Sequence, residues 1–246
     1  MDEGSATFGK PQALRAYLLG TLTFDETAVL QRRLMYEVAG DPSAATVLLL
    51  DHPPGITIGR EGSRIHVHLG GDALKSRGWS TQWVARGGGT MLHLPGQVAC
   101  YPLLPLDRLG LTVAAYLDRL HEAVLDILAE SNIRGEVDPS RPGVFVNGRR
   151  IAHVGAAIRN FVSGYGVVLN VNPDLEPFHD VACDGDSEPM TSLQRETIHR
   201  VRLSGVRQQF VEAIQKRFGF TRVSLFHLPR VAASVPGFHA ISQRAS

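Results

Sequence analysis

The sequence predicts an α+β fold in a single domain. Strand-like segments dominate the middle of the chain, and helix-like segments flank them. An Asn147-Gly148 pair between two apolar runs marks a hairpin, so neighbouring strands there should be antiparallel. The chain of 246 residues, 43% of them hydrophobic and 20% charged, is long enough to bury a sizeable core. We expect one domain over residues 13–228, with tails over 1–12 and 229–246.

The first elements are one helix and two buried strands. A helix is predicted over residues 25–39, because Asp25 can cap its first turn and apolar residues recur along one face. The apolar run Thr46–Asp51 is typical of a buried strand, and it ends where His52-Pro53-Pro54-Gly55 turns the chain. A second buried strand is predicted over residues 97–106.

The second half of the chain carries the clearest signals. Residues 112–131 have an apolar stripe of helical period behind the capping residue Thr112. The hairpin joins Val144–Val146 to residues 149–158 through a type I′ turn, for which Asn-Gly supplies two positive-φ positions. A further strand is predicted over residues 165–171, and a last helix over 205–218, ended by Gly219.

Composition argues against several classes of function. Lysine and arginine number 25 against 24 acidic residues, so no overall field favours nucleic acid or an anionic membrane. No apolar run approaches the roughly 20 residues of a membrane span, and the N-terminus lacks a signal-peptide pattern. Two cysteines cannot form a disulfide framework, which fits a reducing compartment. We expect a cytoplasmic protein with no nucleic-acid or membrane partner.

A glycine-rich segment is the first candidate for a binding site. Gly87, Gly88 and Gly89 are adjacent. Because glycine loses much entropy on folding, such a run is expected where the backbone must approach something closely. Arg86 and His93 bring polar groups to the same place, although a flexible loop between two strands is the alternative. A P-loop nucleotide site is absent, since no G-x-x-x-x-G-K-[ST] motif occurs.

The two cysteines differ in their surroundings. Cys100 lies in an apolar run and is expected to be a buried structural residue. Cys183 lies in a polar loop, where a thiol is accessible and can act as a nucleophile if its pKa is lowered. No C-x-x-C pair or H-x-x-x-H cluster occurs, so no metal site is predicted.

Four motifs in order, covering roughly residues 46–195, resemble a known family. They are Asp51-His52-Pro53-Pro54 with Thr57-Ile58-Gly59-Arg60; Arg86-Gly87-Gly88 to His93-x-Pro95-Gly96-Gln97; Gly148-Arg149-Arg150-Ile151-Ala152-His153-Val154-Gly155; and Leu169-Asn170-Val171-Asn172-Pro173-Asp174-Leu175-x-Pro177-Phe178 with Cys183 and Thr191-Ser192-Leu193. The chain resembles the octanoyl-[acyl carrier protein]:protein octanoyltransferases of lipoate biosynthesis. The resemblance implies the catalytic fold of biotin and lipoate protein ligases, with a mostly antiparallel mixed sheet flanked by helices.

The resemblance also implies acyl transfer in two steps. A cysteine takes octanoyl from the thioester of acyl carrier protein and passes it to a lysine of a lipoyl domain, in 2-oxoacid dehydrogenases or the glycine cleavage H protein. A thioester is already activated, so neither ATP nor a cofactor is expected. Cys183 matches the nucleophile, and Arg150 stands where the family has a lysine that lowers the pKa of the cysteine. The implied substrate-binding residues are Arg86, Gly87, Gly88, Gly89, Thr90, Met91, Leu92, His93, His153, Val154, Gly155, Gly166, Val167 and Val168.

Three positions depart from the family pattern. Arg150 replaces the lysine, Tyr165 replaces a histidine, and Asp184 follows the cysteine where the family has glycine. Arginine can supply a field that stabilises a thiolate, but it cannot accept a proton, because the guanidinium stays charged. Asp184 opposes the thiolate by adding a negative charge. His153, His93 and His179 are the candidate replacement bases.

The hairpin register gives Arg150 a defined setting. Phe145 should face Arg150 across the hairpin, and Arg150 should then share a sheet face with Phe145 and Ala152. An unpaired guanidinium is costly among apolar groups, so Arg150 needs an anionic partner, either the Cys183 thiolate or a carboxylate such as Asp184. Residues 150 and 153 point to opposite faces of an ideal strand, so His153 could act beside Arg150 only if the strand is bulged or bent.

The favoured interpretation is an octanoyltransferase that uses Cys183 as its nucleophile. One alternative is a catalytically impaired relative that only binds acyl carrier protein or lipoyl domains. The other is an ATP-dependent lipoate or biotin ligase, which would not need Cys183.

Overall fold

Two β-sheets form the centre of the protein. The computed structural model describes residues 10–185 and 188–228. The large sheet has eight strands in the order β11-β1-β2-β6-β10-β9-β8-β7, and the small sheet has three in the order β4-β3-β5. The strands of the large sheet are β1 (Ala13–Thr21), β2 (Thr46–Asp51), β6 (Gln97–Leu103), β7 (Glu136–Asp138), β8 (Arg141–Val146), β9 (Arg149–Arg159), β10 (Val162–Asn170) and β11 (Arg222–Leu228). Those of the small sheet are β3 (Gly55–Ile58), β4 (Ser80–Trp83) and β5 (Thr90–His93).

The sheets are mixed, with antiparallel pairs in the majority. In the large sheet, β1 runs parallel to both of its neighbours, and every other neighbouring pair is antiparallel. In the small sheet, β3 is parallel to β4 and antiparallel to β5. The predicted α+β class with a mostly antiparallel mixed sheet is therefore confirmed.

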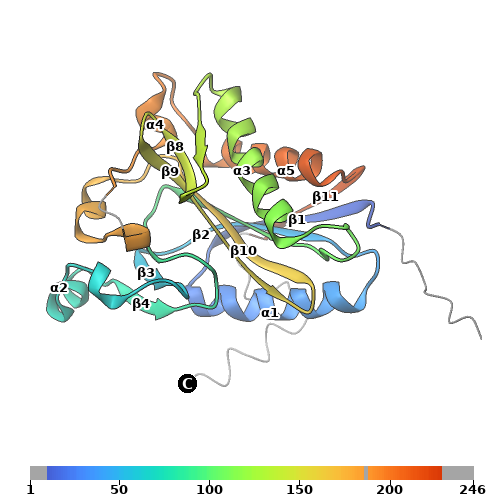
Figure 1. The fold of residues 1–246 in the computed structure, drawn as a ribbon, viewed down its shortest axis with the longest axis horizontal. Helices are drawn as coiled ribbons and strands as arrows, with labels where there is room; N and C mark the ends of the chain where they lie inside the picture. The colour runs from blue at the N-terminus through green and yellow to red at the C-terminus, as the bar shows by residue number, and fades with distance from the viewer. Residues whose placement is uncertain (1–9, 186–187, 229–246) are drawn as a thin grey trace, which may run out of the picture.

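Helices cover both faces of the large sheet (Figure 1). The three long ones are α1 (Phe24–Gly40), α3 (Val113–Glu130) and α5 (Leu203–Phe218), and the two short ones are α2 (Gly71–Ser76) and α4 (Leu193–Glu196). The main core lies between the sheet and α3 and α5, with Leu120, Ile127, Phe210 and Ile214 fully buried. A second core lies on the other face, under α1, and the small sheet adjoins the N-terminal end of that helix (Figure 1).

Local sequence signals placed several element ends correctly. Thr112 caps α3, its hydroxyl accepting a hydrogen bond from the backbone N–H of Ala115 at 3.1 Å. Gly219 ends α5 in the left-handed conformation, with φ of 73°. Asn147 and Gly148 have φ of 49° and 74°, as the type I′ turn between β8 and β9 requires.

Three of the sequence predictions about elements need correction. The cap of α1 is Thr23 rather than Asp25, because Thr23 and Glu26 exchange hydrogen bonds in a capping box. The strand predicted to reach residue 106 ends at Leu103. Strands β1 and β11 were not predicted, although they pair with each other over seven positions.

Most of the predicted tails, residues 1–9 and 229–246, lie outside the described residues. Gln12, which the prediction places in the N-terminal tail, is held by the domain. Its backbone carbonyl accepts hydrogen bonds from the backbone N–H groups of Thr221 and Arg222, at 3.0 and 3.2 Å.

A one-residue bulge in β9 controls the position of the predicted site. Phe145 pairs with Arg150 as expected, but Val144 pairs with Ala152, so Ile151 is an extra residue. Ile151 and Ala152 both pack in the main core. The expectation that Ala152 shares a face with Arg150 is therefore wrong, because the bulge shifts the alternation and brings Arg150 and His153 to the same side.

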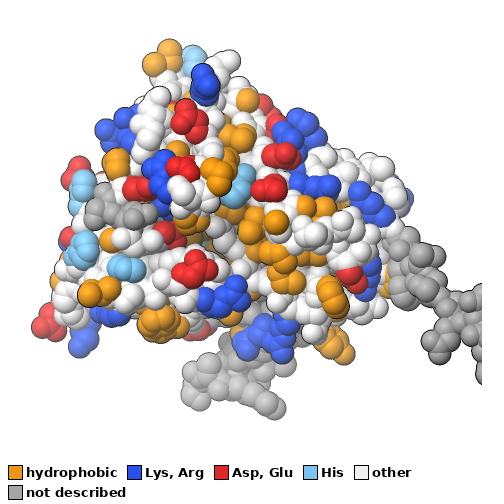
Figure 2. Space-filling view, in the orientation of Figure 1, with side chains coloured by type: hydrophobic (Ala, Val, Ile, Leu, Met, Phe, Trp, Pro, Cys, Tyr) orange, Lys and Arg blue, Asp and Glu red, His pale blue; other side chains and the backbone are white. Residues whose placement is uncertain are grey.

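The charged surface shows no single sign. Figure 2 shows acidic and basic side chains interspersed over one face of the protein, in keeping with the net charge of +1. Within the described residues, no helix is both long enough and apolar enough to span a membrane.

The main core should dominate the stability of the fold. Phe210 is fully buried between α5 and the sheet, so Phe210→Ala should lower the free energy of unfolding by about 3–5 kcal/mol. Ile198 is 95% exposed, and Ile198→Ala should change it by less than about 0.5 kcal/mol. Urea unfolding of both variants tests this difference, and equal losses would contradict it.

Candidate active site

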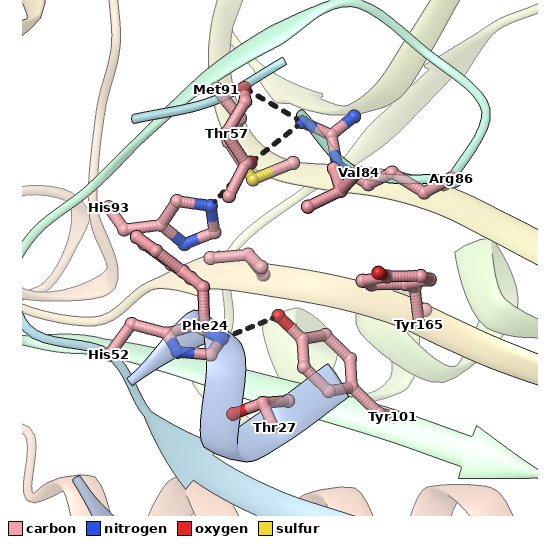
Figure 3. Close-up of a pocket in the computed structure, with 13 residues that line it drawn as sticks. Phe24, Thr27, His52, Thr57, Val84, Arg86, Met91, His93, Tyr101 and Tyr165 are labelled. Atoms are coloured by element: carbon pink, nitrogen blue, oxygen red, sulfur yellow. Dashed lines mark hydrogen bonds between the residues drawn. The ribbon is translucent and has the colours of Figure 1, made fainter. Parts of the chain in front are cut away.

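A pocket of about 400 Å³ lies between the small sheet, α1 and the middle strands of the large sheet (Figure 3). Its walls combine apolar side chains with a few polar ones, as small-molecule sites commonly do. The lining residues are Phe24, Thr27, His52, Thr57, Val84, Arg86, Met91, His93, Tyr101, Gly155, Tyr165, Gly166 and Val168.

Two hydrogen-bonded groups of side chains shape this pocket (Figure 3). Arg86 donates to the hydroxyl of Thr57 at 3.0 Å, and that oxygen lies 2.9 Å from Nε2 of His93. Nδ1 of His52 lies 2.8 Å from the carbonyl of Leu22, which can only accept, so Nδ1 carries the proton. Nε2 of His52 then accepts from the hydroxyl of Tyr101 at 2.9 Å.

Burial keeps the imidazoles of the pocket neutral. It lowers the pKa of His52 to about 4 and that of His93 well below its ordinary value. Burial also raises the pKa of Tyr101, so its hydroxyl stays protonated. Arg86, only 4% exposed, is the cation of the pocket wall. The pocket is therefore suited to a mainly uncharged ligand.

The glycine loop packs its backbone against two other segments. The N–H of Gly87 donates to the carbonyl of Ala156 in β9 at 2.8 Å. A Cβ atom on Gly89 would lie 2.6 Å from Cα of Asp184, which no side chain allows. The close approach expected from the three glycines is thus an approach to β9 and to the 3₁₀ turn Cys183–Gly185.

The carboxylate of Asp184 joins these segments. One oxygen accepts a hydrogen bond from the N–H of Gly89 at 2.7 Å. The other binds a guanidinium nitrogen of Arg150 and lies 3.0 Å from Nδ1 of His153. Burial tends to raise the pKa of Asp184, but the contacts with His153, Arg150 and Gly89 outweigh it and hold that pKa well below its usual range. Asp184 is therefore an anion under ordinary conditions.

Arg150 is fully buried, and its anionic partners are carboxylates. Besides Asp184 it binds Glu188 at 2.9 Å, and its guanidinium lies 5.2 Å from the ring centroid of Phe145. Of the two partners considered from the sequence, the structure shows the carboxylate. The charge of Arg150 is thus balanced by two carboxylates before any thiolate forms.

The Cys183 thiol is buried, contrary to the expectation of an accessible loop cysteine. Its side chain is in the core of the small sheet with Ile56 and Leu92, and the residue is 1% exposed. The polar composition of the loop predicted exposure to solvent. The carboxylate of Asp184, the residue after Cys183, instead forms its contacts inside the protein. Burial raises the pKa of Cys183 to about 12, against the opposing effects of a Leu92 backbone hydrogen bond and of Arg150 and Arg86.

Cys100 is buried in the main core, as the sequence suggested, and burial raises its pKa as well. Its side chain packs among the apolar residues of that core. Among the described residues, no group of His, Cys, Asp and Glu side chains is placed to hold a metal ion.

The structure brings only some of the predicted substrate-binding residues to the pocket. Those that line it are Arg86, Met91, His93, Gly155, Gly166 and Val168. Because side chains alternate along a strand, Leu92 points the other way, into the core that holds Cys183. Val154 and Val167 face the main core. Thr90 donates its hydroxyl to the carbonyl of Ser63 at 3.1 Å.

The remaining predicted residues, Gly87, Gly88, Gly89 and His153, do not line the pocket. Gly87, Gly88 and Gly89 make the loop, and His153 lies beneath it, 1% exposed. Of the other candidate bases, His93 is in the pocket and His179 is exposed.

Sequence reasoning missed His52, Thr57, Tyr101 and Glu188. His52 and Thr57 were part of the family motifs but were assigned no role. Tyr101 had a usable signal, since Ala99, Tyr101 and Leu103 alternate with Val98 and Cys100 along β6 and share the face under α1. Glu188 had none, because it meets Arg150 from 38 positions away.

Similarity to known proteins first defines the class to which this chain belongs. The family model of the lipoyl protein ligase A/B catalytic domain matches residues 25–215. Solved structures share the fold: lipoate-protein ligase A bound with ATP has a TM-score of 0.71 at 15% identity, over 93% of this chain and 92% of that one. A putative lipoate protein ligase from T. acidophilum with bound lipoic acid has a TM-score of 0.70 at 16% identity, over 94% and 93%. The chain belongs to the lipoyl protein ligase A/B family.

Relatives of higher identity narrow the class. The octanoyltransferase of Syntrophobacter fumaroxidans is 37% identical over 184 residues, 74% of this chain and 81% of the relative. That of Geobacter metallireducens is 34% identical over 203 residues, 82% of this chain and 90% of the relative. Within the ligase family, the chain belongs to the octanoyltransferases.

The buried neutral histidines should make the fold sensitive to acid. Since burial lowers the pKa of His52 from 6.5 to about 4, the unfolded chain binds a proton between these pH values that the folded chain does not. His52 alone should then cost about 3 kcal/mol of stability between pH 7 and pH 4. Urea unfolding from pH 7 to pH 4 should show a shallower pH dependence for His52→Gln than for the parent. Parallel curves would contradict a neutral His52.

Proposed function

We propose that the protein transfers an octanoyl group in two steps through a thioester on Cys183. The observation that carries the proposal is the packing of Cys183 against Leu92 of β5, next to Asp184, whose carboxylate binds both the glycine loop and Arg150. Met91 and His93, which flank Leu92 in β5, line the mainly apolar pocket that we assign to the acyl chain. We take octanoyl as the transferred group because the relatives are named octanoyltransferases.

The partners follow from the proposed chemistry. The donor is octanoyl-acyl carrier protein, and the acceptor is a lysine of a lipoyl domain, in 2-oxoacid dehydrogenases or the glycine cleavage H protein. A thioester donor needs no ATP, so the reaction uses no cofactor and takes place in the cytoplasm, where these partners are made. Neither nucleic acid nor a membrane takes part.

A catalytically impaired relative that only binds acyl carrier protein or lipoyl domains is the second candidate. The observation that favours it is the pairing of Arg150 with Asp184 and Glu188, which leaves less of its charge for a thiolate. An ATP-dependent ligase is the third, and ATP–pyrophosphate exchange in the presence of lipoate or biotin identifies it.

Acyl-enzyme formation separates these candidates. After the protein is mixed with octanoyl-acyl carrier protein, intact mass should show one added octanoyl group that hydroxylamine removes. The Cys183→Ala variant should show none, and Cys100→Ala should behave as the parent. An adduct on Cys100, or one that survives Cys183→Ala, would contradict the assignment. A folded parent that gives no adduct would favour the impaired relative.

The pocket should set the length of the acyl chain. Met91 lines it, so a larger rigid side chain in Met91→Phe should shorten the space available. Because overpacking costs about 1–3 kcal/mol, kcat/KM for an octanoyl donor should fall about tenfold while that for a butanoyl donor stays near the parent value. Equal losses for both donors would place the acyl chain elsewhere.

A further inference from the structure

The proposed transfer needs a group that accepts the thiol proton of Cys183, and Arg150 cannot be that group. A thiol whose pKa burial raises to about 12 holds its proton at neutral pH. Arg150 cannot take that proton, because a guanidinium stays charged, and both of its terminal nitrogens are bound to carboxylates. The need for another base rests on the proposed function through Cys183.

His153 also contacts Asp184, and only one of its two ring nitrogens is hydrogen-bonded. Its Nδ1 lies 3.0 Å from an oxygen of Asp184, and an ionised carboxylate only accepts, so Nδ1 carries the proton. Nε2 then carries the lone pair. That nitrogen is buried and has no hydrogen-bond partner among the described residues, a costly arrangement for a group without a task.

The bulge at Ile151 makes this arrangement possible. Without the extra residue, Arg150 and His153 would point to opposite faces of β9. With it, both reach the carboxylate of Asp184, which adjoins Cys183 in the chain. The extra residue thus places the imidazole of His153, which can accept a proton, beside Arg150, which cannot.

The groups around His153 keep its ring neutral. Asp184 faces it from the 3₁₀ turn, Arg150 from its own strand, Arg86 from the glycine loop and His93 from β5. Burial lowers the pKa of His153, and the two arginines act in the same direction against the opposing effect of Asp184. At pH 7, His153 is therefore a free base rather than an imidazolium.

We propose that His153 is the general base of the acyl transfer and that Asp184 is its positioning residue. In the first half, Nε2 takes the thiol proton of Cys183 through one bridging water as sulfur bonds to the carbonyl carbon of the donor thioester. The bond from that carbon to the donor sulfur breaks, and the donor sulfur leaves with the proton. In the second half, Nε2 takes a proton from the acceptor amine as its nitrogen bonds to the same carbon. The bond to Cys183 breaks, and the proton returns to the Cys183 sulfur.

The rate of Cys183 acylation as a function of pH, measured in single turnovers on the full chain, tests this proposal. In the parent, the rate should level off above a midpoint below pH 6.5, because His153 is then fully unprotonated. A parent rate that rises tenfold per pH unit up to pH 9 would report direct ionisation of the thiol and overturn the proposal. This measurement needs no variant.

His153→Asn tests the same group by removal. The asparagine amide can still donate to Asp184, but it offers no base, so acylation at pH 7 should slow by about 10²- to 10⁴-fold. The remaining rate should rise tenfold per pH unit. Unchanged rates and an unchanged profile would overturn the proposal, as would failure of added imidazole to raise the rate of a folded His153→Ala variant.

His66 provides the matched control. Its ring lies against Gly185 in the same turn, and its Nδ1, unlike that of His153, has no carboxylate or other partner among the described residues. His66→Asn should leave acylation at the parent rate, and a loss equal to that of His153→Asn would overturn the assignment. A parent that forms no acyl-enzyme at all would refute the proposed function instead.

Asp184→Asn tests the positioning role. The amide oxygen can still accept from Nδ1, but the negative charge is gone, so His153 becomes less basic. The midpoint of the pH profile should therefore move to lower pH as the plateau falls. A lower plateau at an unmoved midpoint would mean that Asp184 only supports the fold, and would overturn its role toward His153.

Discussion

The carboxylate of Asp184 is the interaction on which the site depends. A buried anion is tolerated only when it is paired and its oxygens are hydrogen-bonded. Here the pairing groups come from two segments, the glycine loop and the bulged strand β9, and Asp184 joins both to the turn that carries Cys183. Each segment is thereby fixed relative to the thiol. The glycine loop, the turn with Cys183 and the imidazole of His153 are thus joined through a single side chain.

The same carboxylate explains how two departures from the family pattern coexist. An arginine at position 150 brings a permanent buried cation, and an aspartate at position 184 brings the anion that balances it. Asp184 adopts φ of 54°, a left-handed conformation that glycine adopts freely and that aspartate tolerates better than most residues. Taken together, the two substitutions form an ion pair in which the charge of each residue offsets that of the other.

Local signals in the sequence were sufficient for the elements that local interactions define. The helix α3 and the β8–β9 hairpin follow from a capping residue, an apolar period and an Asn-Gly turn. Strands β1 and β11 could not be found in this way, since their pairing joins residues more than 200 positions apart. The bulge at Ile151 also has no local signal, because an isoleucine suits a regular strand equally well.

Sequence motifs were sufficient to select the candidate site residues, but not to predict which of them packing would bury. Cys183 and Arg150 were singled out by a family motif, and the carboxylate partner of Arg150 followed from the cost of an unpaired guanidinium. The burial of Cys183 did not follow, because a polar loop is exposed only if its polar groups turn to water. Asp184 turns inward instead, and the loop closes over the thiol.

The position of β1 has a consequence for how the chain is made. This strand pairs with β2 on one side and with β11 on the other, and a hydrogen bond from Thr221 to Gln12 spans 209 positions along the chain. As a ribosome produces the protein in order, one edge of β1 therefore stays open until nearly all of the domain has been synthesised. Open strand edges are templates for pairing with other chains. The nascent chain thus exposes such an edge at β1 until its C-terminal strand has been made.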